Sequence, residues 1–177
     1  MWEIDYLVAT GRLRVEVSRL LDEFLATGDP DRAADLMVLI ESAVAPVSGG
    51  LADDAGGVAS AVVAGLPRMP ADTRAEALLL LTQIVGSIEA TEGLASDEAR
   101  RLIESMFPML AAMVEVGSDG DLAQGVDLIS LCSSLSPACG ERAAYYLGRI
   151  VERATGTLRE SAERELAEVS RMITRGT

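Results

Sequence analysis

The chain has 177 residues, of which 49% are hydrophobic and 3% aromatic, and its formal net charge is −13. This length and composition suit one globular domain with a continuous core and exclude an intrinsically disordered chain. A surface of this sign repels the phosphates of nucleic acids and of anionic membranes, so we expect neither as a partner.

Three residue types are missing from the sequence: histidine, lysine and asparagine. Without histidine there is no Ser-His-Asp or Cys-His couple and no imidazole metal ligand. Without lysine there is no Schiff-base nucleophile and no phosphate-binding loop of the GxxxxGK[ST] type. We therefore predict no catalytic residues, no metal and no cofactor, and the sequence favours a protein that is not an enzyme.

The chain also lacks the usual signs of membrane insertion or export. No apolar run approaches the roughly 20 residues that a spanning helix needs. The first residues do not show a basic segment followed by an apolar one, which is the pattern of a signal peptide. We therefore expect a cytoplasmic protein.

Helical periodicity dominates from residue 13 onward, and strand-like alternation is nearly absent. The first predicted helix covers residues 13–26 and ends before Gly28. Asp29-Pro30 then supplies an N-cap and a first-turn proline for a second helix, which runs to about residue 44. We expect its buried stripe to contain Ala33, Leu36, Met37, Leu39 and Ile40.

A glycine-rich connection over residues 48–57 separates these two helices from the rest. Six further helices are predicted, over residues 58–66, from about 72, from 96, and over 119–135, 141–153 and 158–174. Pro108 falls inside the fifth helix, where a proline removes one hydrogen bond and crowds the preceding turn. A kink or a break is expected there.

A short pattern recurs in alternate helices. Ala33-Ala34-Asp35-Leu36 parallels Ala75-Glu76-Ala77-Leu78 at an offset of 42 residues, and Ala123-Gln124-Gly125-Val126 is a weaker echo 48 residues later. HEAT and armadillo repeats recur at about 40–47 residues. The sequence thus predicts one all-α domain over residues 1–177, a short α-solenoid of about four helical hairpins. A helical bundle is the alternative.

Residues 15–88 also resemble a known family. The residues that carry the resemblance are Trp2-x-Ile4-x-Tyr6, Ser18-Arg19-Leu20-Leu21, and Thr27-Gly28-Asp29-Pro30 before a helix rich in arginine and alanine. Together they are similar to the HEAT-like repeat proteins common in actinobacteria. The resemblance implies a fold and a binding surface rather than a reaction, and the glycine-rich connection departs from the pattern.

Polar residues next to the apolar stripes of the second helices are the candidate binding site. In a solenoid these helices line the concave groove, where such proteins usually bind. The candidates are Asp35, Ser42, Gln83, Asp127 and Ser134. A solvated helix face is the alternative reading of the same residues.

Tyr145 and Tyr146 are further candidates for contact with a partner, because neighbours on a helix point about 100° apart and cannot both be buried. Cys132 and Cys139 are too few for a metal site without other donors. We expect two small buried residues, although a disulfide across the intervening turn stays open.

Three acidic motifs invite a chemical interpretation that the spacing does not support. Asp53-Asp54 resembles the start of the DDxxD magnesium motif, which fails at Gly57, so an N-cap role is expected. Asp119-Gly120-Asp121 lacks the later ligands of a calcium loop and is read as a turn and an N-cap. Glu89 and Glu92 share a helix face, where a pair of carboxylates could act as acid and base, but a solvated helix end is the simpler reading.

The resulting functional hypothesis is a non-enzymatic scaffold that binds a protein or peptide along an acidic concave face. Residues 1–60 carry a net charge of −7 and residues 61–120 carry −5, so the partner is expected to be basic. The alternative is a small-molecule-binding protein, or an enzyme that uses carboxylates or tyrosine, with a pocket between hairpins. The sequence leaves the oligomeric state open.

Overall fold

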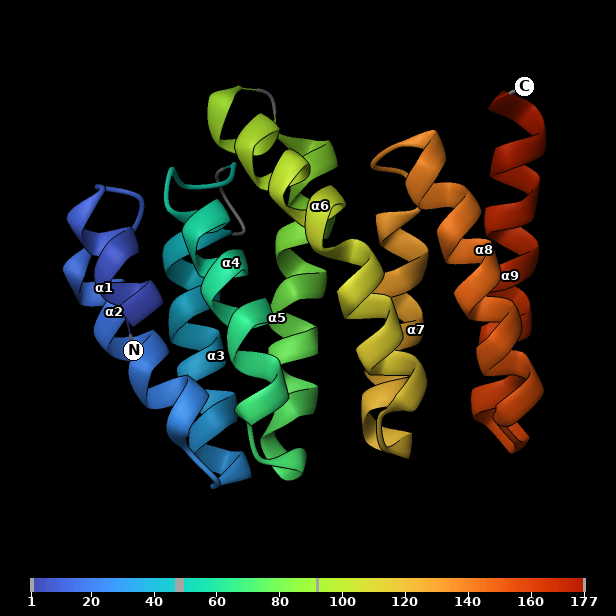
Figure 1. Ribbon diagram of the computed structural model, residues 1–177, viewed down its shortest axis with the longest axis horizontal. Coiled ribbons are helices and arrows are strands. Elements are labelled where there is room, and N and C mark those ends of the chain that lie inside the picture. The colour runs from blue at the N-terminus through green and yellow to red at the C-terminus, as the bar shows by residue number, and fades with distance from the viewer. Residues whose placement is uncertain (1, 47–49, 92, 177) are drawn as a thin grey trace. The chain divides into compact units, whose positions relative to one another are not determined.

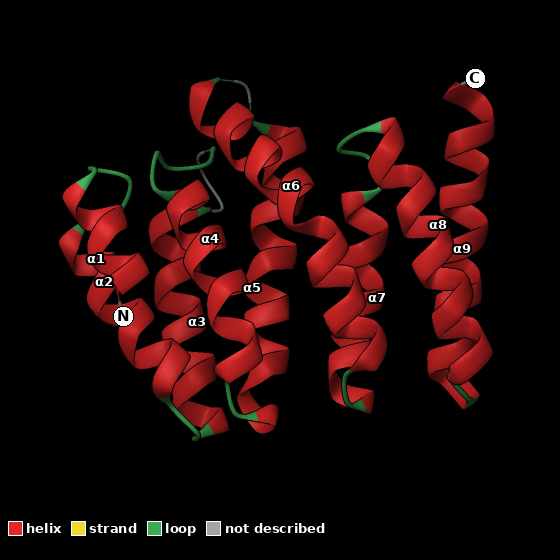
Figure 2. Ribbon diagram, in the orientation of Figure 1, coloured by secondary structure: helices red, strands yellow, loops and turns green. Residues whose placement is uncertain are grey.

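The computed structural model describes residues 2–46, 50–91 and 93–176, and within these ranges it contains helices and loops but no strand (Figure 2). The all-α class predicted from the sequence is confirmed. None of the helices in these ranges is both long and apolar enough to cross a membrane. The helices are α1 (Trp2–Ala9), α2 (Val15–Ala26), α3 (Pro30–Val44), α4 (Ala55–Gly65), a 3₁₀ turn (Leu66–Arg68), α5 (Ala71–Ala90), α6 (Leu94–Val116), α7 (Asp119–Cys132), α8 (Pro137–Arg153) and α9 (Gly156–Gly176) (Figure 1).

Helix starts agree with the predictions where a capping residue precedes the apolar pattern. The side chain of Asp29 accepts hydrogen bonds from the N–H groups of Asp31 and Arg32, and Pro30 occupies the first turn of α3. Before α7 the cap is Ser118 rather than the expected aspartate. Its hydroxyl accepts from the N–H of Asp121, whose carboxylate accepts from the N–H of Ser118 in return. Such reciprocal bonds satisfy two donors that a helix start would otherwise leave unpaired.

Three features of the helices differ from the predictions. Helix α1 was not predicted, because eight residues are too few for a clear period. Helix α4 begins at Ala55, three residues early, and includes Gly56 and Gly57 in spite of their low helix propensity. At Gly57 a side chain would collide with the main-chain carbonyl of Arg12, so close packing explains the glycine. Helix α6 continues through Pro108, so of the two outcomes expected there, a kink or a break, the break does not occur.

The chain divides into two compact units, residues 1–103 and residues 104–177. In the first unit α2 packs against α3 and α4 against α5, so the unit contains two helical hairpins. The first helices of the two hairpins, α2 and α4, are also in contact, as are the second helices, α3 and α5, while α1 lies against α2 and α4 (Figure 1). The core between the two layers includes the fully buried Phe24, Leu36, Ile40 and Leu81.

The second unit contains the end of α6 together with α7, α8 and α9. Helices α8 and α9 form a long hairpin, and α7 packs against both. The guanidinium of Arg149 pairs with the carboxylate of Glu115 at 2.9 Å, and Arg153 donates to the main-chain carbonyls of Glu115 and Gly117. These bonds fasten α8 to the last turn of α6. Whether the two units form one solenoid domain over residues 1–177 stays a prediction.

Candidate functional site

Three of the five predicted groove residues lie in the two-helix layer that α3 and α5 form in the first unit. Asp35 and Ser42 belong to α3, Gln83 belongs to α5, and all three side chains are exposed. The hydroxyl of Ser42 donates to the main-chain carbonyl of Val38 at 2.8 Å, so it is already engaged within its own helix. We call the exposed side of this layer, with Asp35, Val38, Leu39, Ser42 and Gln83, the α3–α5 face.

Two apolar side chains on the α3–α5 face were not predicted to be exposed. Val38 is 52% and Leu39 is 50% exposed, whereas the sequence analysis placed Leu39 in the buried stripe, which is wrong. Five apolar residues follow one another from Leu36 to Ile40, and a helix turns about 100° per residue, so they cannot all face one core. Leu36, Met37 and Ile40 are buried, which leaves Val38 and Leu39 facing outward.

The other two groove candidates lie in the second unit. Asp127 is exposed on α7, and Ser134 is exposed just after the end of that helix. The hydroxyl of Ser134 donates to the carbonyl of Leu131 at 2.8 Å.

The two tyrosines behave as the helix geometry predicts. Tyr145 is 60% exposed, and Tyr146 is half-buried with its hydroxyl donating to the carbonyl of Pro108 at 3.4 Å. Their ring centroids are 5.3 Å apart in an edge-to-face arrangement. Tyr146 thus joins α8 to α6, while Tyr145 remains available to a partner.

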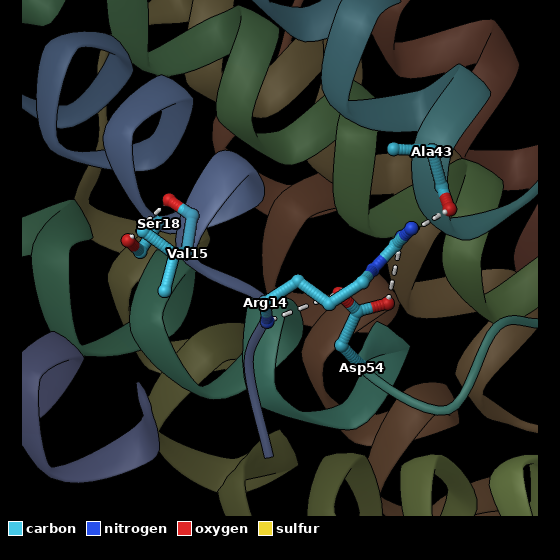
Figure 3. Close-up of polar contacts among 5 residues, drawn as sticks. All are labelled: Arg14, Val15, Ser18, Ala43 and Asp54. Carbon is cyan, nitrogen blue, oxygen red and sulfur yellow. Dashed lines mark hydrogen bonds and ion pairs between the residues drawn. The ribbon is translucent and has the colours of Figure 1, made fainter. Parts of the chain in front are cut away.

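An ion pair between Arg14 and the buried Asp54 lies in the first unit, and sequence reasoning missed it (Figure 3). The guanidinium donates from Nε to Oδ2 at 2.8 Å and from Nη2 to Oδ1 at 3.2 Å, and Nη2 also donates to the carbonyl of Ala43 at 2.9 Å. Asp54 is 5% exposed. It occupies the N-cap position of α4, as predicted, but its side chain makes no capping bond and is committed to Arg14.

This ion pair fastens three helix ends together. Arg14 precedes α2, Ala43 lies in the last turn of α3, and Asp54 precedes α4. The hydrogen bonds to Asp54, followed by the attraction of its charge, raise the pKa of Arg14 above the ordinary value for arginine. Two side chains 40 residues apart carry no signal that links them in a single sequence, so the pair could not have been predicted.

A cavity of 670 Å³ lies beside the ion pair, lined by Val8, Leu13, Val15 and the exposed Asp53 among others. Its charged lining residues are Arg14, Asp53 and Asp54, and the cavity holds one more acid than base. Because Arg14 and Asp54 neutralise each other, we interpret the pair as structural, and Asp53 is the other carboxylate among the lining residues.

The acidic motifs do not form a metal centre in the described parts of the chain. No group of three cysteine, aspartate or glutamate side chains there is placed to hold a metal ion. Asp121 belongs to the cap of α7. The prediction for Glu89 and Glu92 concerns side chains that lie outside those described.

The two cysteines are free and buried, as the simpler prediction held. Burial, and to a lesser degree the nearby Cys139, raise the pKa of the Cys132 thiol far above its ordinary value. A thiol that stays protonated is neither a nucleophile nor a metal ligand. Cys132 is therefore a packing residue.

No protein-family model matches the chain, and neither does any curated protein or any solved structure with which it was compared.

Proposed function

We propose that the protein is a non-enzymatic scaffold whose α3–α5 face binds a basic peptide or protein segment. The observation that carries this proposal is the pair of half-exposed apolar side chains, Val38 and Leu39, on the same helix as Asp35 and Ser42. Exposed apolar residues flanked by polar ones are typical of interaction surfaces. A segment with both apolar and basic side chains would satisfy both features.

The charge of the first unit supports a basic partner. Residues 1–103 contain 17 acidic residues and 8 arginines, a net charge of −9, whereas residues 104–177 carry 11 and 7, a net charge of −4. A field of this sign speeds encounter with cations and repels acidic surfaces. The first unit is therefore the better candidate for the interface.

The packing within the first unit supports the HEAT-like interpretation. First helices pack beside first helices and second helices beside second helices, which is how consecutive repeats stack in a solenoid. Leu36 and Leu78, 42 positions apart in the recurring pattern, are both buried in the adjacent helices α3 and α5. A binding surface on the second helices and a cytoplasmic location are parts of the same proposal.

The test uses the full chain and synthetic amphipathic helical peptides. One fluorescent peptide carries six arginines on its polar face, and a second has glutamates in their place with the same apolar residues. We expect saturable anisotropy with the arginine peptide only. The Val38→Gln/Leu39→Gln variant and the Asp35→Arg/Gln83→Arg variant should each bind it at least about tenfold more weakly, the equivalent of losing one good contact.

Matched controls separate this face from the rest of the surface. Val15→Gln removes another half-exposed apolar side chain of the first unit, and Asp127→Arg reverses an exposed charge of the second unit. Both should bind the arginine peptide as the unaltered protein does, and all variants should melt at nearly the same temperature. Equal weakening in the controls, or equal binding of the two peptides, would refute the proposal.

A further inference from the structure

A stretch of sequence at α3, in the first unit, recurs at α7, in the second. Both stretches have the pattern Gly-Asp-x-x-x-x-x-Asp-Leu-x-x-Leu-x-x-Ser, which begins at Gly28 before α3 and again at Gly120, 92 residues later. Six of the fifteen positions are identical, in a register two positions away from the weaker echo that starts at Ala123. The two helices also have the same place in their units, because α3 packs against α5 and α7 packs against α9.

Corresponding residues of the two stretches have the same environment. The first leucine of the pattern is fully buried in both, and the second is partly exposed, 50% in α3 and 36% in α7. The second aspartate and the serine are exposed in both, and each serine hydroxyl donates to a main-chain carbonyl of the preceding turn at 2.8 Å. The matching pairs are Asp35 and Asp127, Leu36 and Leu128, Leu39 and Leu131, and Ser42 and Ser134. The second unit thus presents on α7 the same outward pattern that the first unit presents on α3.

The layer that α7 forms with α9 is the counterpart of the layer that α3 forms with α5. The hydroxyl of Ser130 donates to the carboxylate of Glu165 at 2.8 Å, which joins α7 to α9. Ser130 stands where α3 has the half-exposed Val38, so this layer has one apolar residue fewer on its surface. We call its exposed side the α7–α9 face, with Asp127, Leu131, Ser134 and, on α9, the 41% exposed Met172.

The α7–α9 face adjoins an apolar recess. A cavity of 350 Å³ has Ser134 and Met172 of the face in its lining, together with Val169 and Ile173 of α9. All of its lining residues belong to residues 104–177, so the recess is complete within the second unit. Partners commonly place an apolar side chain in a recess of this kind, where it is shielded from water. The face therefore offers an exposed leucine and, next to it, room for an apolar side chain of a bound segment.

The charge of α7 selects the occupant. The helix contains three aspartates and no arginine, and two of the aspartates, Asp119 and Asp127, are exposed. An acidic surface attracts cations and repels acidic segments. The chemistry that fits the α7–α9 face is therefore that of a segment with both basic and apolar side chains.

We propose that the α7–α9 face is a second docking site for a basic amphipathic segment, so that one chain binds two such segments. This inference rests on the function proposed for the α3–α5 face. The second site binds at least about tenfold more weakly, because it lacks the counterpart of Val38 and lies in the less acidic unit. Binding of a trace of labelled peptide therefore reports on the α3–α5 face and is unchanged by Asp127→Arg.

The test follows leucine and isoleucine methyl groups of the full chain by NMR, with the arginine and glutamate peptides of the preceding section. Leu39 reports on the α3–α5 face, and Leu131 and Ile173 report on the α7–α9 face. We expect the arginine peptide to shift all three with saturation, the last two at a peptide concentration at least about tenfold higher. The glutamate peptide should shift none of them.

The same titration separates the two proposals. Saturable shifts of Leu39 with unchanged Leu131 and Ile173 would overturn the second site and leave the proposed function of the α3–α5 face intact. Unchanged Leu39 would refute the proposed function itself, and the inference that rests on it.

Two double variants assign the second site to its face. Asp127→Arg/Leu131→Gln should weaken the binding that Ile173 reports by at least about tenfold and leave the titration of Leu39 as it was. The control Met109→Gln/Glu152→Arg makes the same two kinds of change at exposed residues of α6 and α8, and both titrations should stay unchanged. All of these are surface substitutions, so the melting temperatures should be nearly equal. Equal weakening at Ile173 in the control would show that the attraction comes from the overall charge, which would overturn the assignment to the α7–α9 face.

Discussion

Asp54 illustrates how a residue can occupy one structural position and perform another task. It stands immediately before α4, where an aspartate commonly accepts from the N–H groups of the first turn. In this chain its carboxylate is taken by Arg14 instead, which also reaches the carbonyl of Ala43. A bidentate guanidinium is a stronger donor than two main-chain N–H groups, so the long-range pair prevails over the local cap.

We predict that Arg14→Gln lowers the free energy of unfolding by about 1–3 kcal/mol, because Asp54 is left buried without its cation. Since the side chain of Arg14 is 55% exposed, water can reach Asp54 after the substitution. The loss of unfolding free energy should therefore lie toward the lower end of this range. Adding Asp54→Asn should restore part of the loss, because an amide costs less to bury than a carboxylate. Chemical denaturation followed by circular dichroism measures each value.

The neighbouring Arg12 provides the control. It pairs with Glu98 at 3.7 Å, and both side chains are about half exposed, so Arg12→Gln should cost less than about 1 kcal/mol. The raised pKa of Arg14 does not make the stability vary with pH in the ordinary range. The stabilisation is complete below the unfolded value and is lost only as the pH rises through the still higher folded value. Similar losses of unfolding free energy in the Arg14 and Arg12 variants would show that the Arg14–Asp54 pair stabilises the protein no more than an exposed ion pair does.

At the same scale, Cys132 should be inert in the folded protein. Burial raises the pKa of its thiol, so at pH 8 the reactive thiolate is essentially absent. We predict that a thiol-reactive dye at pH 8 labels the native protein only very slowly and labels two thiols at once after denaturation. Rapid labelling of Cys132 in the native state would contradict both the burial and the raised pKa.

At the scale of the element, the glycines within these helices have two different structural roles. A Cβ atom added at Gly125 in α7 would overlap the side chain of Val114 in α6, so the absence of a side chain lets the two helices approach. A Cβ atom at Gly86 in α5 would meet nothing within 4 Å. The first glycine is required by packing, whereas the second only weakens its helix.

We therefore predict opposite effects of the same substitution. Gly125→Ala should lower the free energy of unfolding by about 1–3 kcal/mol, because it overfills a packed contact. Gly86→Ala should raise it by about 0.5–1 kcal/mol through the better helix propensity of alanine. Denaturant unfolding of both variants tests the pair, and a loss of stability in Gly86→Ala would mean that α5 is covered at that position.

At the scale of the whole chain, the net charge of −13 without any lysine bears on every partner. We predict no measurable binding to duplex DNA at about 0.15 M salt, because binding to DNA is driven by cations that displace counterions from its phosphates. Fluorescence anisotropy with a labelled duplex measures this directly. Salt-dependent binding at micromolar protein would contradict the prediction and would indicate a basic surface assembled from the 15 arginines.

The sequence by itself determined the all-α class, most helix starts and the exposure of Asp35, Gln83 and Asp127. These follow from interactions within a few residues: caps, prolines in the first turn and apolar periodicity. The sequence did not predict helix α1 or the early start of α4. Helix α1 is too short to show a period, and the glycines of α4 are helical only through packing.

Only the tertiary structure decided which distant groups meet. It paired Arg14 with Asp54, directed Leu39 outward, and buried the Oγ of Ser133 without a hydrogen-bond partner in the described part of the chain. Each outcome depends on the angle at which one helix packs against another. A shift of one position along the sequence rotates the helix face by about 100°. A single sequence constrains where the helices form far more tightly than how each helix is rotated about its axis. Local hydrogen bonds determine helix formation, whereas long-range packing determines the rotation.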